Sequence, residues 1–397
     1  MSLLAPGIPL SLYIHLPWCV EKCPYCDFNS HQLNESFDEK KYVTSLLTDL
    51  EQDLPKIWGR SVETIFIGGG TPSLFSGAAI DELISGVRAR LMLRADPEIT
   101  LESNPGTADA NNYQAYRNAG VNRLSIGVQS FEDAQLKKLG RIHDASQAVD
   151  AFQLARKAGF ERINLDLMYA LPAQSVEDAL VDLDKAIALN PEHISWYQLT
   201  IEPNTGFNRY PPKQLPEDDL IWEIQQAGAE KLQTAGFKQY EISAWSRDFE
   251  ESQHNLNYWE FGDYLGIGAG AHGKITDLSE GKIFRTRRRK QPSHWLDDQN
   301  NYLAEYSAIK NNDLALEFMM NILRLNRGVS AQVFTERTGL MLHEISSALT
   351  KARNKSLMDK RSDILRPTAR GLNYLNDLLA LFMDVEVKNN IVIKEIT

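Results

Sequence analysis

Short apolar segments alternate with amphipathic ones along the first half of the chain. The apolar segments are rich in Val, Ile, Leu and aromatic residues, which is typical of strands, and the stretches between them repeat apolar residues every three or four positions, which is typical of helices. The predicted strands are SLYIHL (11–16), VETIFIGG (62–69), EITLES (98–103), NRLSIGVQS (122–130), RINLDLMYAL (162–171) and HISWYQLTI (193–201). The predicted helices include 38–54, 78–91 and 175–190. This alternation predicts an α/β fold with a parallel sheet, either doubly wound or closed into a complete or partial barrel.

The alternation stops at about Thr205. A proline-rich connector, NRYPPKQLPEDD (208–219), precedes a helix predicted to end near Ala235. The glycine-rich FGDYLGIGAGAHG (261–273) predicts turns or a close approach of two backbones. From about Asp313 the pattern is mostly helical and compatible with a small winged-helix-like domain. We therefore divide the chain into three parts: a barrel (1–205), its extension and connector (206–312) and a helical domain (313–397). The last part ends in the strand-prone VEVKNNIVIKEIT (385–397).

Composition and charge narrow the class of protein. Of the 397 residues 43% are hydrophobic and 24% are charged, as is usual for a soluble globular protein of two or three domains. No apolar run approaches the roughly 20 residues that cross a bilayer, and no basic region opens the N-terminus, so we expect a cytoplasmic protein. The formal net charge of −11 argues against a general nucleic-acid binder, which would need a basic surface.

All three cysteines of the chain lie in one short loop. Cys19, Cys23 and Cys26 have the spacing C-x3-C-x2-C, and without thiols elsewhere they cannot form a disulfide framework. Three clustered thiolates can hold a [4Fe–4S] cube, which ordinarily takes four ligands, so one iron would stay open to a substrate. Two alternatives are a zinc ion with His15 or His31 as the fourth ligand, and three structural thiols without metal.

Polar or glycine-rich features recur where successive predicted strands end. The cysteines follow the first strand and GGGTP (68–72) follows the second. Glu102 and Gln129 end the third and fourth strands, and Asp166 lies in the fifth. Because α/β barrels carry their chemistry at the carboxyl ends of the strands, we expect these residues to meet at one site.

These motifs resemble the radical S-adenosylmethionine superfamily, whose signature is C-x3-C-x2-C with an aromatic residue, here Tyr25, before the last cysteine. More closely, the chain is similar to the oxygen-independent coproporphyrinogen III oxidase family and most similar to its haem-chaperone branch. The matching motifs, between about Leu10 and about Met383, are YIHLPWCVEKCPYCDF, IFIGGGTPS, ESNPG, SIGVQSF, LGRIH, NLDLMYALP, TIEPNT and HNLNYW. The resemblance implies a partial (β/α)6 TIM-like barrel with a C-terminal, mostly helical, winged-helix-like domain.

The resemblance also implies which residues hold the iron–sulfur cluster and which contact S-adenosylmethionine. Cys19, Cys23 and Cys26 would hold a [4Fe–4S] cluster whose fourth iron binds S-adenosylmethionine and whose electron breaks the sulfonium bond. The residues implied to contact S-adenosylmethionine are Tyr13, Tyr25, Gly69, Gly70, Thr71, Glu102, Gln129, Arg141 and Asp166. Glu102 is suited to accept hydrogen bonds from ribose hydroxyls, and the glycines would leave room for the ligand. The sequence departs from the family at Ala170, where glycine is usual.

Two features separate the branches of that family. The oxidases carry a further cysteine two residues after the last cluster ligand, where this chain has Phe28. The motif HNLNYW resembles a haem-binding motif, in which His254 would be the axial ligand and Tyr258 and Trp259 would face the porphyrin. We therefore predict a haem chaperone. The alternatives are a coproporphyrinogen III oxidase-type decarboxylase and a zinc-stabilised interaction module, and for His254 a histidine bonded within a loop.

The predicted function sets the expected partners. They are haem, a haem-acceptor protein (a respiratory haem protein is one candidate) and an electron donor for the cluster, with membrane contact only through a partner. We expect a monomer or a homodimer. The basic run FRTRRRK (284–290) predicts a solvated loop, or otherwise a site for haem propionates or an acidic partner.

Overall fold

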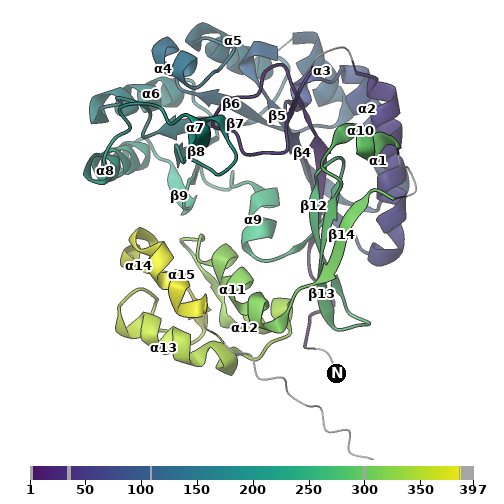
Figure 1. Cartoon of the computed structure of the whole chain (residues 1–397), viewed down its shortest axis with the longest axis vertical. Helices are drawn as coiled ribbons and strands as arrows, with labels where there is room; N and C mark the ends of the chain where they lie inside the picture. Colours follow the sequence, from purple (N-terminus) through teal and green to yellow (C-terminus); the bar gives the residue numbers. More distant parts are fainter. Residues whose placement is uncertain (1–2, 34–36, 108–109, 298–300, 384, 386–397) are drawn as a thin grey trace, which may run out of the picture.

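The computed structural model describes residues 3–33, 37–107, 110–297, 301–383 and 385. One twelve-stranded sheet runs through the molecule in the order β14-β13-β12-β11-β1-β4-β5-β6-β7-β8-β10-β9 (Figure 1). The six predicted strands form its parallel centre: β1 (Leu10–Leu16), β4 (Val62–Gly69), β5 (Leu93–Ser103), β6 (Arg123–Gln129), β7 (Arg162–Tyr169) and β8 (His193–Gln198). They lie side by side in chain order, so the prediction of a partial α/β barrel is confirmed.

Helices follow these strands and arch around the outside of the curved sheet (Figure 1). They are α1 (Glu39–Asp53), α2 (Gly77–Arg90), α3 (Ala110–Ala119), α4 (Asp133–Lys138), α5 (Ala145–Lys157), α6 (Val176–Ala188) and α8 (Asp218–Thr234). Several begin at a local signal in the sequence, because Asp38 caps α1, Ser76 caps α2, and Asp144 and Ser175 form capping boxes on α5 and α6. Their apolar faces pack on the sheet in one large core.

Residues 206–312 extend the sheet at both edges. Antiparallel β10 (Ala244–Ser246) and β9 (Lys238–Glu241) continue it beyond β8. Beyond β1 lie β11 (Asp263–Ile267), parallel to β1, and then antiparallel β12 (His272–Asp277), β13 (Lys282–Arg288) and β14 (Leu303–Ala308). Besides α8, this part contributes the helices α7 (Gly206–Arg209), α9 (Gln253–Trp259) and α10 (Pro292–Asp297) outside the sheet.

The glycine-rich segment 261–273 is only partly the turn that its composition predicts. Five of its residues form β11, a strand beside β1. Gly266 allows a close backbone approach, since a Cβ there would lie 1.9 Å from the carbonyl oxygen of His272. Gly268 and Gly270 have positive φ and do make the turn to β12. The segment therefore contains both the turn and the close approach that its glycines predict, and the strand β11 was not predicted.

The basic run 284–290 is not the solvated loop that its charge predicts. Most of it belongs to β13, and Arg288 is only 1% exposed. Its guanidinium lies between two buried carboxylates of α1, with Nε donating to Asp49 Oδ1 at 2.7 Å and Nη2 to Asp53 Oδ2 at 2.6 Å. The run thus supplies a buried ion-pair cluster that joins β13 to α1.

The C-terminal part is mostly helical, as predicted, and has a core of its own. It consists of α11 (Asn311–Ile322), α12 (Ala331–Thr338), α13 (Ser346–Asn354), α14 (Ala369–Asn373), α15 (Leu375–Met383) and the antiparallel pair β15 (Val329–Ser330) and β16 (Ile364–Leu365). Leu256 of α9 belongs to that core, so α9 connects the barrel to these helices (Figure 1). Apart from Val385, the strand-prone tail lies outside the described residues. No helix in the described ranges combines the length and the apolar character that a membrane span requires.

Candidate functional site

The cysteine loop follows β1 and is braced by loops from across the barrel. Cys19 ends the short strand β2 (Trp18–Cys19), which pairs with β3 (His31–Gln32), and a turn brings the Cys26 N–H to the Cys23 carbonyl at 3.1 Å. Pro24 packs against two glycines, since a Cβ on Gly140 or Gly206 would lie 2.6 or 3.0 Å from its ring atoms. Larger residues at these glycines would push the loop away from the barrel.

One cavity at the carboxyl ends of the strands collects nearly all the residues that the sequence singled out. Its lining includes Cys19, Cys23, Tyr25, Cys26, Gly69, Gly70, Thr71, Glu102, Gln129, Arg141 and Asp166. They come from the cysteine loop, the turn after β4, the ends of β5, β6 and β7, and the loop before α5. The topology rule that placed them together from sequence therefore holds.

Tyr13 is the exception among the predicted residues. Its side chain lines a second cavity on the other side of the cysteine loop, and its hydroxyl lies 2.9 Å from His15 Nδ1. Tyr13 and His15 are two residues apart on β1, so their side chains lie on the same face of the strand. Tyr13 is therefore not among the residues that line the first cavity, and its contact with S-adenosylmethionine stays a prediction.

The histidines near the cysteine loop do not complete a zinc site. His15 uses both ring nitrogens, because Nε2 lies 2.9 Å from the Asn29 carbonyl in addition to the contact with Tyr13. His31 Nε2 lies 3.3 Å from Asn29 Oδ1. Among the described residues no three or more His, Cys, Asp or Glu side chains are arranged to hold a single metal ion. The zinc alternative therefore has no support in the geometry.

The glycine turn after β4 is packed against protein on the side where side chains would project. A Cβ on Gly69, which has φ +118°, would lie 2.5 Å from the His15 ring, and one on Gly70 would lie 2.4 Å from the Trp18 carbonyl oxygen. The backbone N–H groups of Gly69, Gly70 and Thr71 donate to Glu102 Oε2, the Leu16 carbonyl and the Trp18 carbonyl. These glycines therefore serve close packing more than ligand clearance, and the turn has no free N–H to offer a ligand.

Two half-buried carboxylates, Glu102 and Asp166, face this cavity. Burial raises the pKa of Glu102 to about 7, although the Gly69 N–H at 3.0 Å acts in the opposite direction. Burial also raises the pKa of Asp166, whose oxygens accept from Ser125 Oγ at 2.9 Å and Asn164 Nδ2 at 2.8 Å. Both groups are therefore held as hydrogen-bond partners in a weakly hydrated site, where a ligand with hydroxyl donors would bind well.

Arg141 carries an unused donor into the same cavity. Its Nη2 donates to the Gly127 carbonyl at 2.7 Å and its Nη1 lies 3.7 Å from Cys23 Sγ, but its buried Nε has no hydrogen-bond partner. Leaving such a donor unpaired costs about 1–3 kcal/mol, so an acceptor on a bound ligand would stabilise it. Beside the three thiols, this guanidinium and its unused donor fit a metal cluster with an anionic ligand. Burial raises the pKa of the Cys19 and Cys26 thiols, so a metal that binds there would have to displace their protons.

Sequence reasoning missed other residues of the cavity. Ser103, Asn104, Ser125 and Tyr197 also line it. Ser125 pairs in register with Glu102, and Tyr197 donates to Gln129 Oε1 at 2.7 Å. The available signal was their position at strand ends beside residues already chosen. Ala170, the departure noted above, has φ +59° directly after β7, which explains why glycine suits that position.

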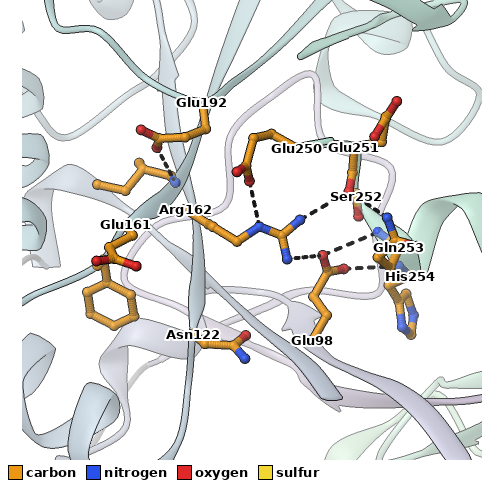
Figure 2. A network of polar contacts seen from close by, with 12 residues as sticks. Glu98, Asn122, Glu161, Arg162, Glu192, Glu250, Glu251, Ser252, Gln253 and His254 are labelled. Carbon is orange, nitrogen blue, oxygen red and sulfur yellow. Dashed lines mark hydrogen bonds and ion pairs between the residues drawn. The ribbon is translucent and has the colours of Figure 1, made fainter. Parts of the chain in front are cut away.

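The segment HNLNYW forms α9, whose start is fixed to the barrel by a polar network (Figure 2). Glu98 of β5 accepts from the backbone N–H groups of Gln253 at 3.2 Å and His254 at 3.0 Å. Arg162 of β7 pairs with Glu98 at 3.0 Å and donates to Glu250 Oε2 at 2.8 Å. A carboxylate at a helix N-terminus satisfies free N–H groups, so this network holds α9 in place.

The His254 side chain is fully buried and has no free ring nitrogen. Nδ1 lies 2.8 Å from Thr64 Oγ1 and Nε2 lies 2.8 Å from the Tyr258 hydroxyl. Burial lowers the pKa of His254 to about 3, so the imidazole is neutral. Iron coordination would require both exposure and a broken hydrogen bond, which argues against His254 as an axial ligand. Tyr258 and Trp259 do line the second cavity.

Comparison with known proteins agrees with this architecture. Residues 13–186 match the radical SAM superfamily and residues 309–373 match the HemN C-terminal domain. A protein named heme chaperone HemW, from Escherichia coli (strain K12), is 51% identical over 94% of this chain and 98% of its own length. The heme chaperone HemW of Haemophilus influenzae is 47% identical over 95% and 99%. The chain belongs to the HemW family.

A solved structure shows that the HemW-family chain shares its fold with an enzyme. Coproporphyrinogen III oxidase (HemN) from Escherichia coli, described as a radical SAM enzyme, superposes with a TM-score of 0.80 over 96% of this chain and 91% of its own. Its sequence is 24% identical, so the likeness concerns the fold alone. The residues that separate activities must therefore be judged from the site itself.

Proposed function

We propose that this HemW-family chain binds haem and transfers it to an acceptor protein, and that it retains a [4Fe–4S] and S-adenosylmethionine site. The observation that carries the proposal is the 51% identity to a protein named heme chaperone HemW over 94% of the chain. The second cavity supports it, because it adjoins the cysteine loop and is large enough, at about 700 Å³, for a cofactor. The acceptor protein and an electron donor belong to the same proposal.

The first cavity has a division of roles that fits the cluster and the nucleotide. Cys19, Cys23 and Cys26 would hold three irons, and when bound the cluster supplies an electron to the sulfonium of S-adenosylmethionine. The Arg141 guanidinium beside Cys23 offsets thiolate charge. Glu102 accepts ribose hydroxyls. The N–H groups of the glycine turn are already hydrogen-bonded. Its carbonyl oxygens are therefore the backbone groups that can accept from the ammonium group of S-adenosylmethionine.

Phe28 argues against the oxidase alternative. It stands where the oxidases carry a further cysteine, its side chain is 60% exposed, and it lines both cavities. An apolar ring there offers no sulfur to a substrate or radical. The chain therefore lacks a group on which the resemblance to the oxidases depends.

Haem titration of the reconstituted chain under oxygen-free conditions tests the proposed function. We expect stoichiometric haem binding, transfer of that haem to an apo-haemoprotein, and no decarboxylation of coproporphyrinogen III in the presence of reductant and S-adenosylmethionine. A chain that turned over coproporphyrinogen III, or that bound no haem, would contradict the proposal.

The affinity for S-adenosylmethionine is expected to rise with pH. Ribose hydroxyls donate best to an ionised carboxylate, and the pKa of Glu102 near 7 leaves it mostly protonated at pH 6. The apparent dissociation constant should fall about tenfold between pH 6 and pH 8, as the competent fraction increases. Equilibrium dialysis with labelled S-adenosylmethionine measures it. Glu102→Gln should bind more weakly and with no such pH dependence, whereas a wild-type chain with a flat profile would contradict the assignment.

A further inference from the structure

The second cavity has walls suited to a flat aromatic ligand. It lies between the cysteine loop, β1, β11 to β13, α9 and α11, and the aromatic residues that line it are Tyr13, Phe28, Tyr258, Trp259, Phe261 and Tyr264. Tyr258 and Tyr264 meet edge to face with centroids 4.5 Å apart. Aromatic and apolar surfaces of this kind bind the faces of a macrocycle.

The cavity is basic in a protein that is acidic overall. Lys22, Lys274, Arg285 and Lys290 line it, against one carboxylate, Asp27. Lys274 and Arg285 are already engaged, since they pair with Asp263 at 3.1 Å and Glu317 at 2.5 Å.

The other two lysines still have donors to offer. Lys22 Nζ donates to the Phe28 and Ser30 carbonyls, which leaves one of its three protons, and the Lys290 amine has no partner among the described residues. The indole N–H of Trp259 is a buried donor without an acceptor. The cavity therefore offers unused donors to an anion.

Three histidines line the cavity, and they differ in what their rings already bind. His15 and His31 have the contacts with Tyr13 and Asn29 described above. The His272 imidazole is exposed and makes no hydrogen bond to any described residue. Burial and the cations Arg287, Lys290 and Arg285 lower its pKa, so it is neutral and able to bind a metal at ordinary pH.

We propose that haem occupies this second cavity, with the His272 imidazole as an iron ligand and with Lys22 and Lys290 binding its propionates. This inference rests on the proposed function. It replaces His254 as the ligand and assigns His254 to holding Tyr258, whose hydroxyl it contacts, in the cavity wall. It also places the haem against Phe28 and Ser30, which line the cluster cavity from the other side.

The ligand assignment is tested by titrating ferric haem into the full chain and into His272→Ala. We expect the variant to lose the histidine-ligated Soret and low-spin spectrum and to bind at least tenfold more weakly, and added imidazole to restore the spectrum. The matched control is His343→Ala, an exposed histidine of the C-terminal part, which should behave as wild type. His254→Ala, checked for folding by circular dichroism, should keep the histidine-ligated spectrum.

The propionate assignment has its own control in the ligand. The Lys22→Ala/Lys290→Ala double variant should bind haem about tenfold more weakly than wild type, yet bind haem dimethyl ester, which lacks carboxylates, as wild type does. A wild-type chain that bound no haem would overturn the proposed function. A wild-type chain that bound haem, with His272→Ala unchanged or with the histidine signature lost only in folded His254→Ala, would overturn this inference and leave the function intact.

Discussion

Replacing Cys19, Cys23 or Cys26 singly by alanine is expected to abolish the iron–sulfur cluster. The thiols face one cavity and no other cysteine exists in the chain, so no protein sulfur could substitute for the one removed. The two thiolates that remain would not retain a [4Fe–4S] cluster that the wild-type chain binds through three thiolates. Anaerobic reconstitution should give about four iron and four sulfide per wild-type chain and almost none per variant. Chemical iron and sulfide analysis measures this directly, independent of any activity.

His31→Ala is the matched control for the cysteine variants. His31 lies in the same loop segment and was a candidate zinc ligand, so it separates the two metal hypotheses within one experiment. We expect this variant to keep its iron and sulfide. Full cluster content in a cysteine variant, or zinc in place of iron in wild type together with metal loss in His31→Ala, would refute the cluster assignment.

The barrel and its site could be predicted because their signals are local. A parallel sheet needs buried strands and intervening helices, and both appear as short patterns in the sequence. Once the strands are known, the end at which Glu102, Gln129 and Asp166 lie follows from the direction of the chain. The face of the strand on which Tyr13 lies depended on how β1 sits between β4 and β11, and β11 was hidden by its glycines.

The residues whose predicted roles the structure does not support have partners far away in the sequence. His254 is satisfied by Thr64, 190 positions earlier, and Arg288 by Asp49, 239 positions earlier. No local pattern distinguishes a histidine or arginine that will be buried among distant partners from one that faces solvent. Charge therefore favoured a solvated basic loop, and the resemblance of HNLNYW to a haem-binding motif favoured a ligand role for His254 over the hydrogen-bonded histidine that was its alternative; tertiary packing supports neither prediction.

Arg288→Ala is expected to lower the free energy of unfolding by about 3–5 kcal/mol, the usual cost of removing one member of a buried ion pair. The guanidinium and its carboxylate partners Asp49 and Asp53 are almost fully buried. The variant therefore leaves Asp49 without a counter-charge and Asp53 with Lys56 alone, whose amine lies 2.6 Å from Asp53 Oδ1. The matched control lies on the same strand: Arg287 pairs with Glu305 at 3.3 Å, with both side chains well exposed. Arg287→Ala should cost about 0–1 kcal/mol. Urea unfolding of both variants measures the difference.

The penalty for Arg288→Ala should also depend on pH. Burial raises the pKa of Asp49 from 3.8 to about 6, so between about pH 4 and 6 the folded chain keeps a proton that the unfolded chain releases, and stability falls as pH rises through that window. Removing the guanidinium should therefore cost more at pH 8, where Asp49 must ionise or hold a proton against the solvent, than at pH 5.

Arg288→Met combined with Asp49→Asn and Asp53→Asn should recover much of the loss, because no charge remains buried. Equal penalties for Arg288→Ala and Arg287→Ala would show that the cluster does not hold β13 to α1. The Gly268 N–H donates to the same Asp49 at 3.0 Å, and Asn29 of the cysteine loop donates to the next carbonyl, that of Ala269, at 2.9 Å. Loss of the ion pair should therefore loosen the cysteine loop as well as the sheet.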